Sequence, residues 1–123
     1  MKSSAVFMHL YRCLNGKREK SMYDVKTPLL DDLIVRLKKK HPFEYNDLPK
    51  AIDEALKLKV DTKKYNPESA EWDIQIEKYW GQMKYIDGYL RALLCVNIIR
   101  SYNKMDGIRK EVKKIIEYME LKK

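Results

Sequence analysis

Glycine and proline are scarce in this chain, with four of each among 123 residues. Gly-rich all-β chains and low-complexity disordered segments contain far more of both, so the composition fits neither class. Hydrophobic residues make up 45% of the sequence and charged residues 36%. A chain of this size buries roughly two thirds of the surface that it exposes when unfolded. The sequence therefore predicts one globular helical domain over residues 1–123.

Cysteine and histidine are also rare. Cys13 and Cys95 lie far apart and form no CxxC pair, which argues against a zinc site and against a disulfide framework. His9 and His41 have no acidic partner at metal-ligand spacing. The glycines form neither a GxxxxGK[ST] loop nor a GxGxxG turn, the two common phosphate-binding loops. We therefore expect a protein that is not an enzyme, with no catalytic residue, metal or cofactor.

Long apolar runs are missing as well. No stretch reaches the roughly 18 apolar residues that a transmembrane helix needs. The apolar stretch at residues 5–14 is short and is interrupted by His9 and Arg12, so it predicts a first helix and not a signal peptide. We expect a cytoplasmic protein with no membrane partner and no small-molecule substrate.

Apolar residues recur with the helical period over most of the chain. Thr27 followed by Pro28 is typical of a helix start, and Asn66 followed by Pro67 repeats this signal. The periodicity predicts helices at residues 3–14, 28–40, 47–58 and 67–104, and a fifth after Gly107. The expected fold is all-α, a compact antiparallel bundle of four or five helices built around one long central helix.

The predicted helix at residues 67–104 is apolar on two sides. One stripe runs from Trp72 to Met105, and a second stripe occupies residues 85–99. A helix with such coverage should be enclosed on several sides, but the other helices are short compared with its length of nearly 40 residues. A second subunit or a protein partner would supply the missing cover. The predicted interface residues are Trp80, Tyr85, Tyr89, Ala92, Val96 and Ile99.

Small residues recur along the same segment. Gly81, Gly88 and Cys95 are spaced by seven residues, and with Ala92 they form a strip over which another helix could approach closely. Isolated glycines are also tolerated inside helices, at a cost of about 1 kcal/mol each relative to alanine, so the strip does not require a partner.

The net charge of +8 permits an acidic partner such as nucleic acid or an acidic protein. Residues 1–66 carry a net charge of +6, residues 67–77 a charge of −4 and residues 78–123 a charge of +6. The basic cluster at residues 36–40 falls at the end of a predicted helix, where the helix dipole favours positive charge. That cluster therefore does not by itself indicate nucleic-acid binding.

The last predicted helix carries a basic group that local helix stability does not explain. Arg109 and Lys110 are expected in its first turn, against the dipole, and they form like-charged i,i+4 pairs with Lys113 and Lys114. These four residues are the candidate contacts to an anion or nucleic acid. Two alternatives stay open: the helix is continuous with the preceding one, or the lysine stems lie along the apolar stripe.

One acidic group resembles part of a metal site. Glu68 and Glu71, with Glu77 beyond them, are similar to the ExxE motif of the all-α nucleotide pyrophosphatases, a resemblance that would imply bound magnesium. That family also needs an ExxD pair, and the corresponding stretch here offers only Asp87. Carboxylates at the start of a helix are explained by its dipole, so no metal site is predicted.

These observations favour a non-enzymatic interaction protein that binds a protein partner, or a second copy of itself, through the long helix. The abundance of Lys, Ile and Tyr is typical of AT-rich genomes, which adds the hypothesis of a phage-encoded or mobile-element-encoded regulator or inhibitor of host machinery. The alternative is a small basic nucleic-acid-binding regulator. A helix-turn-helix has weak support, because about seven residues separate the second and third predicted helices where three or four are typical.

Overall fold

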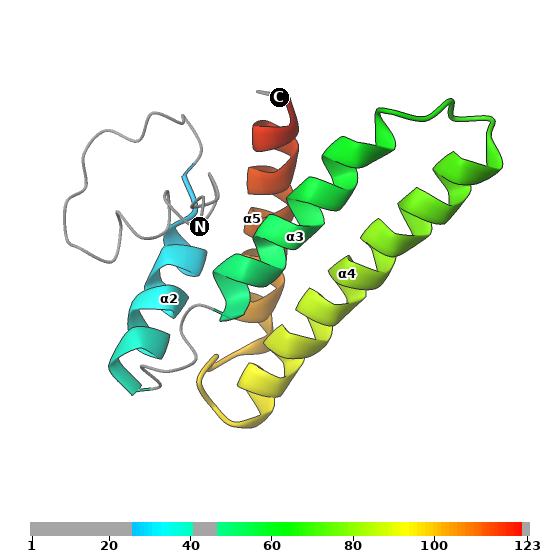
Figure 1. The fold of residues 1–123 in the computed structure, drawn as a ribbon. Helices are drawn as coiled ribbons and strands as arrows, with labels where there is room; N and C mark the ends of the chain where they lie inside the picture. Colours follow the sequence, from blue (N-terminus) through cyan, green and yellow to red (C-terminus); the bar gives the residue numbers. More distant parts are fainter. Residues whose placement is uncertain (1–25, 41–46, 122–123) are drawn as a thin grey trace.

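A computed structural model describes residues 26–40 and 47–121 of the chain. These residues form four helices and no strand, so the described part of the chain is all-α (Figure 1). The helices are α2 (Pro28–Lys40), α3 (Asp47–Thr62), α4 (Ala70–Cys95) and α5 (Tyr102–Leu121). The first helix predicted at residues 3–14 lies outside the described residues.

Helix α2 has the predicted bounds, but its first turn is capped by another helix. The Thr27 hydroxyl donates a hydrogen bond to the Asp31 carboxylate over 3.0 Å. The backbone N–H groups of Leu29 and Leu30 donate to the Glu111 carboxylate of α5, over 3.3 and 3.0 Å. A carboxylate from α5 thus satisfies two N–H groups that α2 itself leaves without a partner.

Helix α3 is longer than predicted, because its polar last turn also packs against the chain. Val60 lies against the core, and the Lys59 ammonium lies 5.0 Å from the centre of the Tyr79 ring. The Thr62 hydroxyl donates to the carbonyl of Lys59 over 2.6 Å and is buried. These contacts extend the helix to Thr62, past the predicted end at residue 58.

Asn66 and Pro67, predicted to start a helix, lie instead in the turn between α3 and α4. Asn66 accepts a hydrogen bond from the Glu68 N–H over 3.0 Å, so its side chain stabilises the turn and caps no helix. Ser69 is the N-cap of α4, and its hydroxyl accepts from the Trp72 N–H over 3.2 Å. The helix therefore starts at Ala70 and not at residue 67.

The continuous helix predicted at residues 67–104 is wrong, because α4 ends at Cys95. Asn97 has a left-handed conformation with φ of 65°. The N–H of Ile98 donates to the carbonyl of Leu93 over 2.9 Å, and the N–H of Asn97 to that of Leu94 over 3.1 Å. This pair of bonds is a Schellman motif, in which a left-handed residue, often glycine and sometimes asparagine, ends a helix.

Helix α5 begins earlier than predicted. Ser101 precedes it, and its hydroxyl accepts from the Lys104 N–H over 3.2 Å. Because the helix starts at Tyr102, Arg109 and Lys110 lie more than a turn inside it. The prediction that these two cations sit in the first turn, against the helix dipole, is therefore wrong.

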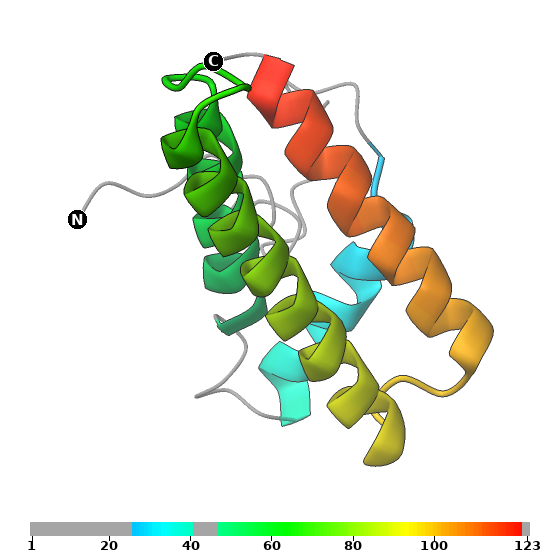
Figure 2. The same cartoon turned by 90° about the vertical axis from the view of Figure 1, so that its right-hand side faces the viewer.

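Helix α5 lies at the centre of the described helices and contacts α2, α3 and α4. Helices α3 and α4 form an antiparallel hairpin, and α4 lies along one side of the molecule (Figures 1 and 2). The predicted central position of the long helix is not confirmed, since only four of the 26 residues of α4 are buried. The largest fully buried side chains are Leu30, Ile34, Leu37, Leu48, Ile52, Leu56, Ile86, Leu90, Met105, Ile115 and Ile116.

Candidate functional site

The side of α4 that faces away from α3 and α5 is exposed along the whole helix. In Figure 2 no described helix lies in front of α4. Its residues are spaced by three, four or seven positions, which places them on one side of a helix. We call this surface the outer face, and it consists of Ala70, Ile74, Gly81, Tyr85, Gly88 and Ala92.

Large apolar side chains of α4 and of its C-cap are exposed to solvent on and beside the outer face. Ile74 and Tyr85 are each 57% exposed, and Val96, just past the end of the helix, is 66% exposed. A single exposed apolar side chain is ordinary, but several along one side of a helix are typical of an interaction site.

The two glycines of the outer face have no packing role within the described chain. A Cβ atom placed on Gly81 or Gly88 would meet no atom within 4 Å. Gly107 of α5 differs, because a Cβ there would lie 2.5 Å from Leu29 Cδ1. Close packing of α2 on α5 therefore explains Gly107. Gly81 and Gly88 lower the stability of α4, and no packing contact in the described chain compensates for this loss.

The structure places the predicted interface residues in three environments. Ile99 is 2% exposed and belongs to the core, and Tyr89 is half-buried against the core. Trp80 is 55% exposed, but five residues separate it from Tyr85, a turn of about 140° around the helix. Trp80 thus lies on a different side of α4, whereas Tyr85 and Ala92 lie on the outer face and Val96 directly follows the helix on that side.

Ile74 belongs to the outer face but was not among the predicted residues. It lies seven residues before Gly81 and 11 before Tyr85, so the helical period assigns it to the same side. The second apolar stripe considered from the sequence began only at residue 85. Extending the strip of small residues towards the start of the helix would have included Ile74.

Acidic residues of the chain itself neutralise half of the predicted basic group on α5. Arg109 is half-buried and pairs with Asp87 of α4 and with Asp106, and Lys110 Nζ lies 3.3 Å from Asp106 Oδ2. Among the described residues, Asp87 Oδ1 and Arg109 Nε are buried and have no hydrogen-bond partner. Lys113 is exposed, as is Lys114.

The acidic residues that resemble an ExxE motif do not converge. Glu68 lies in the turn before α4, and Glu71 and Glu77 are exposed on the helix. Within residues 26–40 and 47–121, no group of three or more potential metal ligands lies together.

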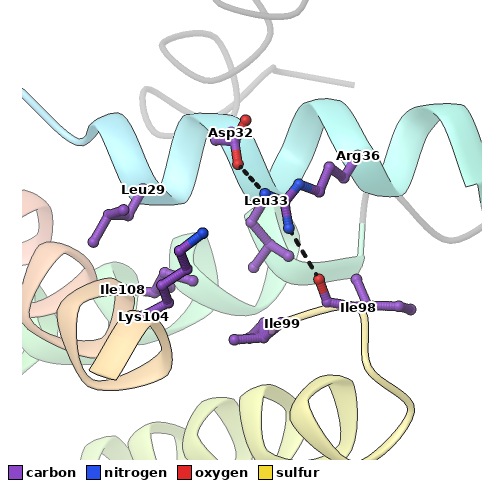
Figure 3. A pocket seen from close by; sticks show the side chains of 8 residues that line it. All are labelled: Leu29, Asp32, Leu33, Arg36, Ile98, Ile99, Lys104 and Ile108. Carbon is purple, nitrogen blue, oxygen red and sulfur yellow. Dashed lines mark hydrogen bonds and ion pairs between the residues drawn. The ribbon is translucent and has the colours of Figure 1, made fainter. Parts of the chain in front are cut away.

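A small cavity lies between α2, the turn after α4 and the start of α5 (Figure 3). Its volume of about 30 Å³ suits one or two water molecules and no substrate. Arg36 pairs with Asp32 over 3.0 Å and donates to the carbonyl of Ile98 over 3.2 Å. This side chain therefore joins α2 to the turn that separates α4 from α5.

An open depression of about 350 Å³ borders the outer face between α3 and α4. Tyr85 lines one side, and Asp47, Lys50 and Glu54 of α3 line the other. Gln82 and Ala51 also line the depression, and the Gln82 amide donates to the carbonyl of Ala51 over 3.0 Å. The depression widens the surface that a bound helix can contact, but it encloses no small molecule.

Among the residues that the structure describes, two side chains have shifted pKa values, and neither lies on the outer face. Burial raises the pKa of Glu111, although the N–H groups of Leu30 and Leu29 act in the opposite direction. Burial, followed by the charges of Glu120 and Glu117, raises the pKa of Tyr79. The geometry of Glu111 is that of a helix cap, so we assign it a structural role.

Comparison with known protein families, with curated proteins and with solved structures gives no match for this chain. None of the helices in the described part of the chain is long and apolar enough to cross a membrane.

Proposed function

We propose that this protein is a non-enzymatic interaction protein that binds another helix through the outer face of α4. The observation that carries the proposal is the coincidence of exposed Ile74 and Tyr85 with Gly81 and Gly88, which have no packing role in the described chain. Large side chains supply apolar area, and the glycines allow a second backbone to approach closely.

The energetic argument rests on the apolar side chains. Complete burial of an isoleucine or valine side chain contributes roughly 1.5–3 kcal/mol. Ile74, Tyr85 and Val96 are each more than half exposed, so a partner can recover most of that contribution. Association has its own entropic cost, and several such side chains are needed to exceed it.

A nucleic-acid-binding regulator is the second candidate. The observation in its favour is the exposure of Lys110, Lys113 and Lys114 on α5. Against it, Arg109 is engaged with Asp87, Lys110 is paired with Asp106, and Glu117 lies beside the lysines. Fewer free cations reduce the number of phosphate contacts, and we therefore favour the protein interface.

Binding of labelled oligonucleotides separates the two candidates. If α5 contacts phosphates, the double variant K110Q/K114Q should make the logarithmic salt dependence shallower by up to about two. Fluorescence anisotropy at two salt concentrations measures this slope. Binding weaker than roughly 100 μM at low salt would remove the nucleic-acid candidate.

Site-specific photo-crosslinking tests the protein interface. A photoreactive phenylalanine analogue at Tyr85 should capture a defined protein, whether a second copy or another chain. The matched control places the same analogue at Lys39, an exposed position on α2, which lies apart from α4 in Figure 1. Crosslinks of equal yield at both positions, or none at Tyr85, would contradict the proposal.

A further inference from the structure

We propose that the helix bound by the outer face is α4 of a second copy of this chain, packed antiparallel with Gly81 at the crossing point. This inference rests on the proposed function and names its partner. It is drawn from two features of the described residues, the charges along one edge of the outer face and the positions of its large and small side chains.

The charges along one edge of the outer face change sign at its middle. Asp73 and Glu77 precede Gly81, and Lys84 and Arg91 follow it, all exposed. The intervals of four and seven residues place these four side chains on one edge of the helix. An antiparallel copy related by a two-fold axis brings the acidic half of each helix beside the basic half of the other.

The register follows from the numbering. Glu77 is four residues before Gly81 and Lys84 is three after it, so a two-fold axis at Gly81 places each Glu77 beside the other chain's Lys84. Asp73 and Arg91 lie eight before and ten after, within about 3 Å of the same register. Asp73, Glu77 and Lys84 form no ion pair among the described residues, whereas Arg91 also pairs with Asp87.

The same register matches large side chains to small ones. Ile74 lies seven residues before Gly81 and Gly88 lies seven after it, so each exposed isoleucine faces the open backbone of a glycine. Ala70 and Ala92 lie 11 residues on either side and face each other. A parallel arrangement would place Ile74 on Ile74 and acidic residues on acidic residues, so the antiparallel one is favoured.

The opposite edge of the outer face supports this register. Lys78 lies three residues before Gly81 and Tyr85 four after it, which brings each ammonium group near the partner's tyrosine ring. An ammonium over an aromatic ring is an attractive contact. Both side chains are exposed in the single chain.

The size of the surface predicts a weak dimer. A helix of 26 residues is about 39 Å long, and a contact strip about 10 Å wide buries roughly 400 Å² on each chain. This area is below that of a standard interface and falls among weak complexes. We therefore expect a dissociation constant on the order of 10–100 μM, at an ionic strength near 0.15 M that screens the net charge of +8.

Sedimentation equilibrium of the full chain between about 5 and 500 μM tests the dimer, and charge reversal tests its register. The single variants E77K and K84E should each weaken association by about tenfold, because each creates two like-charge contacts. The double variant E77K/K84E should restore association to within about threefold of the wild type. The control E117K alters an exposed acidic residue of α5 and should leave association unchanged.

A second variant guards against a loss of folding. G81Q should abolish dimerisation while keeping the helical circular dichroism, because a Cβ atom at this position meets no atom of the described chain within 4 Å. A chain that stays monomeric at about 500 μM would overturn the inference, as would a double variant no better than the single ones. A monomer that still forms a specific Tyr85 crosslink to another protein leaves the proposed function standing, whereas a monomer without that crosslink refutes both.

Discussion

Helices α4 and α5 are both long and carry regular apolar residues, but only α5 is enclosed by its own chain. α5 buries six of its 20 residues and contacts the three other described helices. α4 buries four of its 26 residues, and large apolar side chains remain exposed on its outer face. The difference shows that similar apolar stripes serve the fold on one helix and remain available for binding on the other.

Truncating one isoleucine on each helix is the strongest test of this difference. Ile115 of α5 is fully buried, and Ile115→Ala should lower the free energy of unfolding by about 2–5 kcal/mol. Ile74→Ala deletes the same atoms from a side chain that is exposed on the outer face. This variant should change the free energy of unfolding by at most about 0.5 kcal/mol. Urea unfolding of the monomer measures both, and equal losses would show that the outer face is covered within the chain.

Removal of the Glu111 cap should have the next largest effect. Glu111→Ala leaves the N–H groups of Leu29 and Leu30 without their acceptor, at a cost of about 1–2 kcal/mol. The control Glu117→Ala changes an exposed glutamate of the same helix and should cost less than about 0.5 kcal/mol. Urea unfolding at neutral pH compares the two variants. Similar losses of stability would show that Glu111 does not stabilise the start of α2.

The same carboxyl predicts a pH dependence. Burial raises the pKa of Glu111 above its ordinary value of 4.5, so the folded chain holds this proton more tightly than the unfolded chain. Its contribution to stability is therefore largest below pH 4.5 and is lost as the pH rises through the raised pKa. Relative to Glu111→Gln, which does not titrate, the wild type should lose stability over this interval, and a relative gain would contradict the raised pKa.

An effect of similar size is expected where α4 ends. Asn97 has a φ of 65°, a conformation that a β-branched residue adopts only with strain. Asn97→Val should lower the free energy of unfolding by about 1–2 kcal/mol. Asn97→Gly adopts the same conformation freely and should be within a few tenths of a kcal/mol of the wild type. A Val variant as stable as the Gly variant would show that the turn does not need this conformation.

The smallest expected changes come from the glycines and differ between the two helices. Gly81→Ala should raise the stability of the monomer by about 0.5–1 kcal/mol, since the new methyl group meets no neighbour. In Gly107→Ala the same helical gain is offset by contact with Leu29. Thermal unfolding of dilute protein should therefore rank Gly81→Ala above Gly107→Ala, and the reverse order would contradict the assigned packing.

The sequence predicted the helical segments well where one apolar face coincides with burial. The bounds of α2 and the buried residues of α5 from Ile108 to Met119 follow the helical period, and the structure confirms both. The last turn of α3 was missed because its residues are mostly polar, and packing of Val60 and Lys59 extends the helix there. Local composition does not report such contacts.

The candidate site was predicted only in part. The second apolar stripe contains Tyr85, Ala92 and Val96, which are exposed, but it also contains Ile99, which is in the core. Periodicity carries both stripes across the break after Cys95, because Ile99 keeps the spacing of the second stripe and Ile98, Tyr102 and Met105 keep that of the first. The one local signal of the break was Asn97, a residue type that tolerates the left-handed conformation.

The sequence by itself determined that the described chain is helical and which residues within one helix share a side, because both depend on spacing along the chain. The tertiary structure alone decided which apolar side is covered. α5 lies between α2, α3 and α4, and it supplies Glu111 to α2 and Arg109 to Asp87 of α4. Burial and capping across helices depend on chain segments distant in sequence, so the exposure of Ile74 beside Gly81 becomes visible only once those segments are in place.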